Sequence, residues 1–422
     1  MNTADKNIGD EAWFTSPGLG RVFELLNTDG GEVRVVGGAI RNTLMGEAVG
    51  DVDLATTVLP EDLITRAKAA RIKAIPTGID HGTVTLVIDG QGFEVTTLRT
   101  DIKPMGRHAE VAFGEDWQAD AERRDFTVNA LYADHTGLVH DPVGGMADIE
   151  SRTIRFIGEA EKRIEEDHLR ILRFFRFFAR YGGGRPDADG LRACVRQREK
   201  LNSLSAERVW KELKSLLAAP DPGRSLLWMR QSGILTLLLP ETEKWGIDAV
   251  AGLIASENAH GWSPDPLLRL MAMVPPDTIR MEALAARLKM SKAEAARLKE
   301  WALATAPQAD TAGTVLERLI YRHGKTPVCD RLKLAQAAIR ARPANEIDDK
   351  TLADMASFSK LLARAEKFKR PQFPLNGKDL IKAGLEPGET IGQRLAAAET
   401  KWIESNFTLD HQRLLHLALE KD

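Results

Sequence analysis

The chain has 422 residues, of which 43% are hydrophobic and 28% charged, a composition typical of globular proteins in a length that exceeds one ordinary domain. No apolar run is long enough to cross a bilayer, so a membrane-spanning protein is excluded. The formal net charge of −3 excludes a surface that is basic throughout, although it allows a local basic cleft.

Two further features limit the class of protein. The N-terminal stretch MNTADKNIGDEAW has neither the basic nor the apolar region of a signal peptide, so we expect a cytoplasmic protein. The only cysteines, Cys194 and Cys329, lie outside any CxxC pair. This excludes a disulfide framework and gives no support for a structural zinc site.

The first 150 residues are predicted to form an α+β unit with a mixed sheet. The runs VRVVGG, TVTLVIDG and FEVTTLRTD are rich in β-formers, and the last two are joined by a two-residue turn at Gly90 and Gln91. From about residue 152 strand patterns almost vanish. Amphipathic helical segments follow, with breaks at residues 182–184, 220–223 and 275–276 and a capping box at Ser291 and Glu294. We therefore predict an all-α remainder.

The segment from Val33 to Thr57 combines a strand, a diglycine turn and a helix. The apolar run ends at Gly37 and Gly38, and a short helix is predicted to begin near Ala39. Two glycines at a strand-to-helix junction let backbone N–H groups approach a phosphate, and the helix N-terminus favours the anion. Arg41, one turn into the helix, is predicted to contact the same triphosphate.

Asp51 and Asp53 follow this helix. Alternation along a strand points both carboxylates to one face, and such a pair beside bound phosphates forms a site for Mg²⁺. Glu94 is the candidate third carboxylate, because its β-run FEVTTLRTD can lie beside the Asp51–Asp53 strand. The alternative is a plain turn and a solvated loop. The combined spacing favours nucleotidyl transfer, in which metal ions stabilise the attacking and leaving oxygens.

Arginines concentrate after the α+β unit. Residues 152–214 contain 16 Lys and Arg against 10 Asp and Glu. On a helix predicted from Asp167 to Arg180, one half of the surface carries Arg170, Arg173, Arg176 and Arg180, whereas apolar side chains fill the other half. Such a face requires an anionic partner, so we predict a nucleotide or RNA phosphate there, with a solvated basic face as the alternative.

Two pairs of polar residues suggest how a nucleotide is held. Asp167 and Arg170, one turn apart, offer an acceptor and a planar donor fork that suit a base edge. Arg123 and Arg124 are adjacent, so on a helix they point about 100° apart and cannot both face one ligand. We expect one of these two to contact the nucleotide and the other to be structural.

Five segments resemble, in the same order, the motifs of the class II tRNA nucleotidyltransferase and bacterial poly(A) polymerase family. GGAIRN…GDVD is similar to its first motif, FEVTTLRTD to the strand of the third carboxylate, ERRDFTVNA to RRDFTxNA, EDHLRILRFFRF to EDxxRxLRxxRF, and LSAERVWKEL to ERxxxEL. Together they cover about residues 33–215.

The resemblance implies a domain order and residue roles. It implies a catalytic nucleotidyltransferase head over residues 1–150, a helical neck over residues 151–220 that selects the base, and a helical body and tail over residues 221–422 that bind tRNA. The matched positions imply catalytic carboxylates at Asp51, Asp53 and Glu94. They also imply nucleotide contacts from Arg124, Arg173 and Arg176, and selection of CTP or ATP by Asp167 and Arg170 in place of a template.

The reaction implied is addition of CCA to tRNA from CTP and ATP, with release of pyrophosphate. Poly(A) polymerases of the family typically carry an RRFxxxHV-like signature where this chain has PTGIDHGTVTLVIDG. CC-adding relatives lack a flexible loop, whereas this chain retains residues 101–113, with Arg107 and His108 at the middle. A poly(A) polymerase, a partial CC- or A-adding enzyme and a catalytically idle tRNA-binding protein remain alternatives.

One departure from the family pattern concerns the first motif. Family members commonly carry Asp directly after its arginine, and this chain has Asn42. The amide keeps hydrogen-bonding capacity and loses the charge, so a role in holding Arg41 or a metal is open at this position. The sequence does not indicate the oligomeric state.

Overall fold

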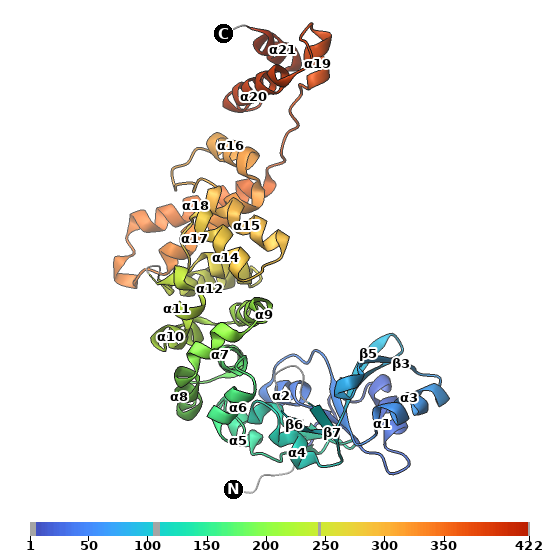
Figure 1. The fold of residues 1–422 in the computed structure, drawn as a ribbon. Helices are drawn as coiled ribbons and strands as arrows, with labels where there is room; N and C mark the ends of the chain where they lie inside the picture. Colours follow the sequence, from blue (N-terminus) through green and yellow to red (C-terminus); the bar gives the residue numbers. More distant parts are fainter. Residues whose placement is uncertain (1–5, 104–109, 244–245, 421–422) are drawn as a thin grey trace. The chain divides into compact units, whose positions relative to one another are not determined.

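The computed structural model describes residues 6–103, 110–243 and 246–420. The chain divides into two compact units, of which unit 1 comprises Met1–Leu216 and Trp228–Leu238, and unit 2 comprises Leu217–Leu227 and Leu239–Asp422. In the described residues every named strand lies before residue 141, and Figure 1 shows helices in the rest of the ribbon. The predicted change from α+β to all-α structure is therefore confirmed.

A mixed sheet forms the centre of the α+β part. The strands are β1 (Val33–Val36), β2 (Asp53–Thr56), β3 (Lys73–Gly78), β4 (Thr83–Ile88), β5 (Gln91–Thr97), β6 (Arg99–Lys103), β7 (Glu110–Phe113), β8 (Tyr132–Ala133) and β9 (Val139–His140). Seven of them form one sheet in the order β3-β4-β5-β2-β1-β8-β9, and β6 pairs with β7 in a second sheet. In the larger sheet β2 and β5 are parallel and the other neighbours antiparallel.

The turn between β4 and β5 lies one residue earlier than predicted. Its residues are Asp89 and Gly90, with φ of 52° and 82°, the left-handed conformations that a two-residue hairpin turn requires. Gln91 instead pairs with Ile88 in the ladder. The pattern of glycines alone did not reveal that Asp89 occupies the first turn position.

Helices surround the sheet and then continue the chain. Up to residue 238 they are α1 (Pro17–Leu26), α2 (Gly38–Met45), α3 (Pro60–Ala69), α4 (Trp117–Glu122), α5 (Gly145–Glu150), α6 (Ala160–Glu166), α7 (Arg170–Tyr181), α8 (Ala188–Arg196), α9 (Ala206–Leu217), α10 (Gly223–Gln231) and α11 (Ile234–Leu238). Short 3₁₀ segments are η1 (Ile79–His81), η2 (Thr127–Asn129), η3 (Arg198–Ser203), η4 (Pro240–Thr242) and η5 (Ala344–Glu346).

The two faces of the sheet are used differently. Phe93 of β5 is buried, and a Cβ placed on Gly18 of α1 would lie 3.0 Å from its ring, so α1 packs on this face. Successive side chains of a strand point to opposite faces. Glu94 therefore points to the other face, where Asp53 of β2 is its register partner. The prediction that the Glu94 strand lies beside the Asp51–Asp53 segment is confirmed.

The arginine-rich segment forms α7, and its apolar half is buried as predicted. Ile171, Leu172, Phe174, Phe175 and Phe178 are each at most 3% exposed. Phe174 stacks on Phe156 with 5.4 Å between ring centroids. This aromatic core fixes the rotation of α7, and so decides which way its arginines point.

Unit 2 consists of helices and connecting segments, with no strand among its described residues. Its further helices are α12 (Asp248–His260), α13 (Pro266–Met271), α14 (Thr278–Arg287), α15 (Lys292–Leu303), α16 (Gly313–His323), α17 (Lys325–Arg340), α18 (Asp349–Lys367), α19 (Gly377–Lys382), α20 (Glu389–Glu404) and α21 (His411–Leu419). The predicted capping box at Ser291 and Glu294 opens α15. No described helix has the length and apolarity needed to cross a membrane.

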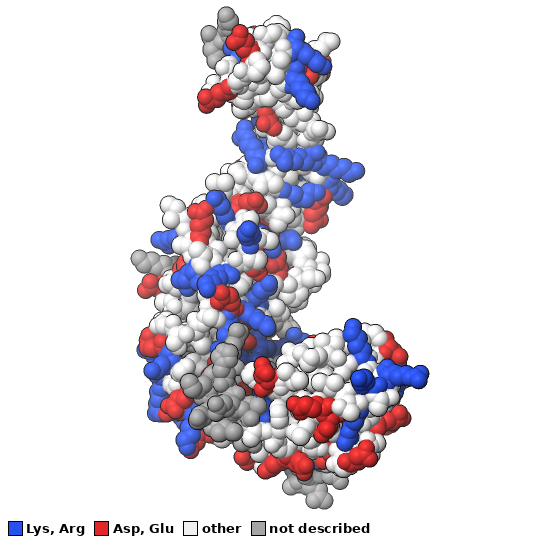
Figure 2. All heavy atoms as spheres, turned by 45° about the vertical axis from the view of Figure 1, so that its right-hand side comes forward, with Lys and Arg blue, Asp and Glu red and all other residues white. Residues whose placement is uncertain are grey.

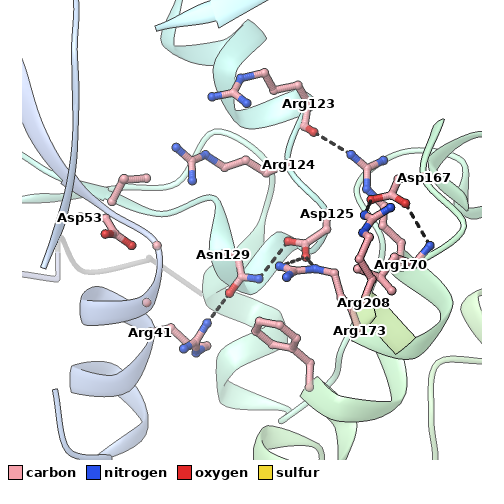
Figure 3. Close-up of a pocket in the computed structure, with 15 residues that line it drawn as sticks. Arg41, Asp53, Arg123, Arg124, Asp125, Asn129, Asp167, Arg170, Arg173 and Arg208 are labelled. Atoms are coloured by element: carbon pink, nitrogen blue, oxygen red, sulfur yellow. Dashed lines mark hydrogen bonds and ion pairs between the residues drawn. The ribbon is translucent and has the colours of Figure 1, made fainter. Parts of the chain in front are cut away.

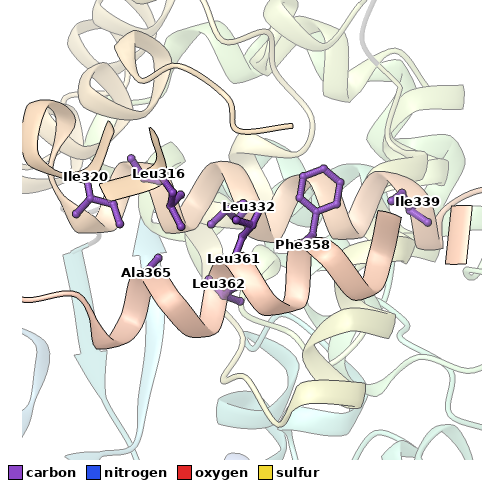
Figure 4. Close-up of a cluster of buried hydrophobic side chains, with 9 residues drawn as sticks. Leu316, Ile320, Leu332, Ile339, Phe358, Leu361, Leu362 and Ala365 are labelled. Carbon is purple, nitrogen blue, oxygen red and sulfur yellow. The ribbon is translucent and has the colours of Figure 1, made fainter. Parts of the chain in front are cut away.

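Two apolar clusters hold unit 2 together. Figure 4 shows the first, in which α16, α17 and α18 meet through Leu316, Leu332, Leu361 and their neighbours. The second joins Tyr321 of α16 to the C-terminal helices through residues that include Leu380, Trp402 and Leu414. Each cluster draws its members from segments far apart in the sequence, so these helices depend on tertiary packing for stability.

Candidate active site

β1 leads into a diglycine turn in front of α2. Gly37 has a φ of 73°, which glycine adopts without strain, and a Cβ there would lie 3.3 Å from the carbonyl oxygen of Asn129. Gly38 begins α2, whose N-terminus has no side-chain cap. The first turn of α2 therefore keeps N–H groups for an anion, as the sequence predicts.

A cavity of about 500 Å³ lies beside this turn. Six arginines and three aspartates belong to its lining, so its walls are positive overall; Figure 3 shows them with the remaining lining residues. The lining residues are Val36, Gly37, Gly38, Arg41, Asp53, Arg123, Arg124, Asp125, Asn129, Asp167, Leu169, Arg170, Arg173, Phe177 and Arg208. Eight of the predicted site residues are among them, and Asp51, Glu94 and Arg176 are not.

Carboxylates stand at one edge of this region. β2 begins only at Asp53, so Asp51 lies before the strand, yet Asp51 and Asp53 are both exposed while Val52 is buried. Partial loss of hydration raises the pKa of Asp53, and the nearby Asp51 raises it further. The pKa of Glu94 is raised by the same loss of hydration and by the charges of Asp53 and Asp51.

The carboxylate donor set fits a hard divalent cation. A carboxylate whose pKa is raised by loss of hydration and by nearby negative charge is stabilised in its ionised form when a cation binds beside it. Among the described residues, no group of three or more His, Cys, Asp or Glu side chains is arranged to hold a metal ion. The fit therefore rests on the oxygen ligands of Asp51, Asp53 and Glu94 and on the raised pKa values of Asp53 and Glu94, not on a preformed cage.

The raised pKa of Asp53 has a consequence for stability. Because loss of hydration and the charge of Asp51 make this pKa higher in the folded than in the unfolded chain, ionisation of Asp53 disfavours folding as the pH rises through that interval. Asp53→Asn is thus expected to raise the Tm of the metal-free protein at pH 7.5, by up to about 3 °C because the side chain is exposed, and to raise it less at pH 4. Scanning fluorimetry in EDTA measures this. Asp80→Asn, which removes an exposed carboxylate of the same unit, is the control; an equal rise of Tm in both variants would contradict a raised pKa of Asp53.

Arg123 and Arg124 both reach the cavity, so the prediction that they cannot face one ligand was wrong. α4 ends at Glu122, and the two arginines are therefore not consecutive residues of a continuing helix. The buried carboxylate of Asp120 binds Arg123 at 2.5 Å and Arg124 at 3.0 Å. Tyr132 donates to Asp120 at 2.7 Å and accepts from Arg124 at 3.1 Å. Asp120, which the sequence reading missed, orients both guanidinium groups.

Asp167 lies outside the arginine helix. It ends α6 in an extended conformation, with φ of −152°, and α7 begins at Arg170. The predicted helical pair of Asp167 and Arg170 is therefore wrong in geometry, although both side chains line the cavity. The Asp167 carboxylate binds Arg208 of α9 at 2.6 Å, and its other oxygen accepts the N–H of Leu169 at 3.1 Å.

Arg170 is held separately from Asp167. Its guanidinium binds Glu166 and donates to the carbonyl oxygens of Arg163 at 2.9 Å and Arg123 at 3.3 Å. Arg208 was not predicted as a site residue. Its position in LSAERVWKEL was part of the family resemblance, but only the approach of α9 to the end of α6 gives it a partner in Asp167.

Two further arginines of α7, Arg173 and Arg176, have carboxylate partners from distant segments. Arg173 binds Asp125 at 2.5 Å, and these contacts lower the pKa of Asp125 against the opposing effect of burial. Arg176 binds Glu212 at 2.6 Å and does not line the cavity. The predicted all-arginine face thus has internal partners in addition to any external anion.

Arg41 is only 7% exposed. Its guanidinium donates to Asn42, Asn129 and the hydroxyl of Tyr181 and lies over the Tyr181 ring, 4.1 Å from its centroid. Burial lowers the pKa of this arginine. Arg107 and His108, which the sequence analysis associated with a flexible loop, lie outside the described residues.

Two parts of the chain match models of protein families. Residues 33–155 match the poly A polymerase head domain, and residues 186–245 match the probable RNA and SrmB-binding site of polymerase A. Both matches fall where the sequence analysis found the family motifs or directly after them.

Of two named relatives, one matches most of the chain and the other matches half of it. The CCA tRNA nucleotidyltransferase 1, mitochondrial, of Mus musculus is 32% identical over 418 residues, which cover 94% of this chain and 89% of that protein. The CCA-adding enzyme of Geobacillus stearothermophilus is 39% identical over 216 residues, which cover 50% of this chain and 52% of that protein.

Among solved structures, the CCA-adding enzyme of Bacillus stearothermophilus in complex with CTP is similar over nearly the whole length. The TM-score is 0.73 at 25% identity, and the match covers 95% of this chain and 96% of that chain. The predicted fold class, an α+β head followed by helical regions, is confirmed.

Proposed function

Since the chain belongs to the family of CCA-adding tRNA nucleotidyltransferases, we propose that it adds CCA to the 3′ end of tRNA from CTP and ATP and releases pyrophosphate. The observation that carries this proposal is the content of one cavity. Its lining includes the diglycine turn, the carboxylate of Asp53, and Asp167 with Arg170. Groups suited to phosphates, to a metal ion and to a base edge thus surround a single space.

In the proposed reaction the oxygen of the RNA 3′-hydroxyl attacks the α-phosphorus of the nucleotide. A new P–O bond forms, the bond between the α-phosphorus and the bridging oxygen breaks, and pyrophosphate leaves. We propose that Asp51 and Asp53 hold Mg²⁺, with Glu94 as the third carboxylate. When bound, Mg²⁺ supplies charge neutralisation and favours ionisation of the attacking hydroxyl.

The chain's own groups orient the nucleotide. The N–H groups of the first turn of α2, which begins at Gly38, bind its phosphates, and Arg124 and Arg173 of the cavity lining add positive charge. Asp167 accepts from the base and Arg170 donates to it, which selects cytosine or adenine without a template. Arg176 acts more remotely, because its partner Glu212 also lies 4.0 Å from Arg173.

The roles that we propose for the domains are those implied in the sequence analysis. Residues 1–150 form the catalytic head, residues 151–220 the neck that selects the base, and residues 221–422 the body and tail that bind tRNA. A cytoplasmic location is part of the proposal, and cell fractionation with an antibody against the chain tests it.

The experiment that tests the reaction offers a tRNA lacking its CCA end to the protein with one nucleotide at a time. We expect CTP alone to add two residues, ATP alone to add almost none, and CTP followed by ATP to add the third. Incorporation of ATP alone in long tails would favour a poly(A) polymerase, and a stop after CTP would favour a CC-adding enzyme. Binding of tRNA with no incorporation would favour the catalytically idle protein.

Unit 2 contains a basic groove suited to the RNA backbone. A cavity of about 580 Å³ is lined by Lys360, Arg364 and Lys367 of α18, by Ser357, Leu361 and Ala363 of the same helix, and by Ala309 and Gly313. No carboxylate belongs to this lining, and the Arg364 guanidinium lies 2.9 Å from Glu317. Figure 2 shows Lys and Arg side chains gathered in this part of unit 2, towards the C-terminal helices.

A double variant with Lys360→Ala and Lys367→Ala is therefore expected to bind tRNA more weakly, while its KM for CTP stays unchanged. Loss of two phosphate contacts should reduce the slope of log Kd against log salt concentration by about 1.5. Filter binding of tRNA over a salt series measures this slope. Lys292→Ala with Lys350→Ala removes two other exposed lysines of unit 2 as the control. A slope equal to that of the unsubstituted protein would exclude the groove from the RNA interface.

A further inference from the structure

α2 and α7 are joined by a buried arginine. We propose that Arg41 is a positioning residue that fixes the diglycine turn relative to the arginines of α7, and that it does not itself bind the triphosphate. This inference rests on the proposed function, since it concerns the same nucleotide site. It replaces the expectation, drawn from the sequence, that Arg41 contacts the phosphates.

The hydrogen bonds of Arg41 leave little capacity for a ligand. A guanidinium has five N–H donors. In Arg41 the Nε and Nη2 atoms donate to Oδ1 of Asn42 at 3.2 Å and 2.9 Å. Nη2 also donates to the Tyr181 hydroxyl at 2.8 Å, and Nη1 donates to Oδ1 of Asn129. Four of the five donors are therefore engaged by the protein, and bidentate binding of a phosphate would require breaking at least one of these bonds.

The partners of Arg41 connect it to both sides of the cavity. Tyr181 is the last residue of α7 and is 6% exposed. Asn129 donates to Asp125 at 2.9 Å, and Asp125 in turn binds Arg173. Figure 3 shows this path from Arg41 through Asn129 and Asp125 to Arg173. α2 is thus tied to α7 at two points, at Tyr181 directly and at Arg173 through two intermediate side chains.

Asn42 extends the connection towards the catalytic carboxylates. While its Oδ1 accepts from Arg41, its Nδ2 donates to the carbonyl oxygen of Ala48 at 2.8 Å. Ala48 lies three residues before Asp51 in the chain. An ionised Asp at position 42 cannot make this donation, because a carboxylate only accepts. The amide therefore gives this chain a link from Arg41 to the segment that leads into Asp51 and Asp53.

A double-substitution experiment tests this role. Arg41→Lys keeps the positive charge and loses the planar guanidinium fork. Tyr181→Phe removes one hydroxyl outside the cavity lining. If Arg41 acts through Tyr181, each single change lowers kcat for CTP addition by about 10-fold through misalignment. The KM for CTP and the inhibition constant of pyrophosphate stay within about 2-fold, and the double variant is no worse than Arg41→Lys alone.

Two results would overturn the proposal. One is independent action, in which Tyr181→Phe leaves kcat unchanged, or in which its fold-loss of kcat multiplies that of Arg41→Lys in the double variant. The other is a weakening of pyrophosphate inhibition by about 10-fold or more in Arg41→Lys, as loss of a direct phosphate contact predicts. The matched control is Tyr321→Phe. This change removes a partly buried hydroxyl that donates to Glu399 in unit 2.

Thermal melts of every variant establish that it is folded before kinetics are compared. The unsubstituted protein is assayed alongside, so that failure of the proposed function and failure of the role of Arg41 can be told apart. If it fails to extend tRNA, the proposed function fails. If it extends tRNA and the substitutions act independently, only the role of Arg41 fails.

Discussion

Asp53→Ala is expected to lower the rate of CTP incorporation by about 10³-fold or more, the loss typical when a group that stabilises transition-state charge is removed. Asp53 lies at the start of β2 opposite Glu94 in the register, and it lines the same cavity as the diglycine turn. Removing its carboxylate removes a proposed Mg²⁺ ligand where the attacking oxygen and the α-phosphorus meet.

Single-turnover incorporation of CTP into a tRNA lacking CCA measures this effect. The Asp53 side chain is exposed, so the fold should survive, which circular dichroism and a melt verify. Asp80→Ala removes an exposed carboxylate of η1 in the same unit and should leave the rate within about 2-fold. Incorporation by Asp53→Ala at near the unsubstituted rate would remove Asp53 from the catalytic site.

The second large effect concerns the choice of nucleotide. In Asp167→Ala the preference for CTP over ATP at the first position is expected to fall by about 10- to 100-fold, because one good hydrogen-bonding contact to a base edge is worth about 1–3 kcal/mol of discrimination. The same change frees Arg208 from its 2.6 Å ion pair. Arg208→Ala should therefore reduce the preference as well, by leaving Asp167 without its partner.

Competition between CTP and ATP in one reaction measures this preference as a ratio of kcat/KM values. Glu165→Ala is the matched control, since Glu165 lies two residues earlier and is exposed. Unchanged discrimination in Asp167→Ala would refute its role in base selection. Loss of rate with an unchanged ratio would make Asp167 structural.

Local patterns predicted the elements that carry the site. The strand, diglycine turn and helix from Val33 onward follow from apolar runs and from glycine, whose positive φ at position 37 suits the turn. The strand of Glu94 follows from its β-rich run, and the buried half of α7 follows from its period. In each case a feature within about a dozen residues decides the element. The pairing of the Glu94 strand with the strand of Asp53 joins distant parts of the chain.

Specific side-chain partners explain what the sequence reading missed. Arg123 and Arg124 both bind the buried Asp120, which lies three and four residues before them. Asp167 leaves the helix because its carboxylate binds the N–H of Leu169 and Arg208 of α9. Periodicity assumes that a helix continues, whereas α4 ends at Glu122 and α6 ends at Glu166.

The arginine face of α7 also has partners that its local pattern does not reveal. The sequence reading expected the face to require an external anion, yet Arg173 and Arg176 find Asp125 and Glu212, which lie 48 and 36 residues away in the chain. These carboxylates hold the guanidinium groups in place before any ligand arrives. Such preorganisation reduces the cost of ordering the site when a nucleotide binds.

In the proposed function this chain itself determines a short, fixed RNA end. Mass spectrometry can test this on a tRNA lacking its CCA end, after incubation with the protein, Mg²⁺ and all four nucleotides. We expect one dominant product that carries cytidine, cytidine and adenosine in that order and grows no further. A ladder of added adenosines, or a product mixture that follows the nucleotide concentrations, would contradict it.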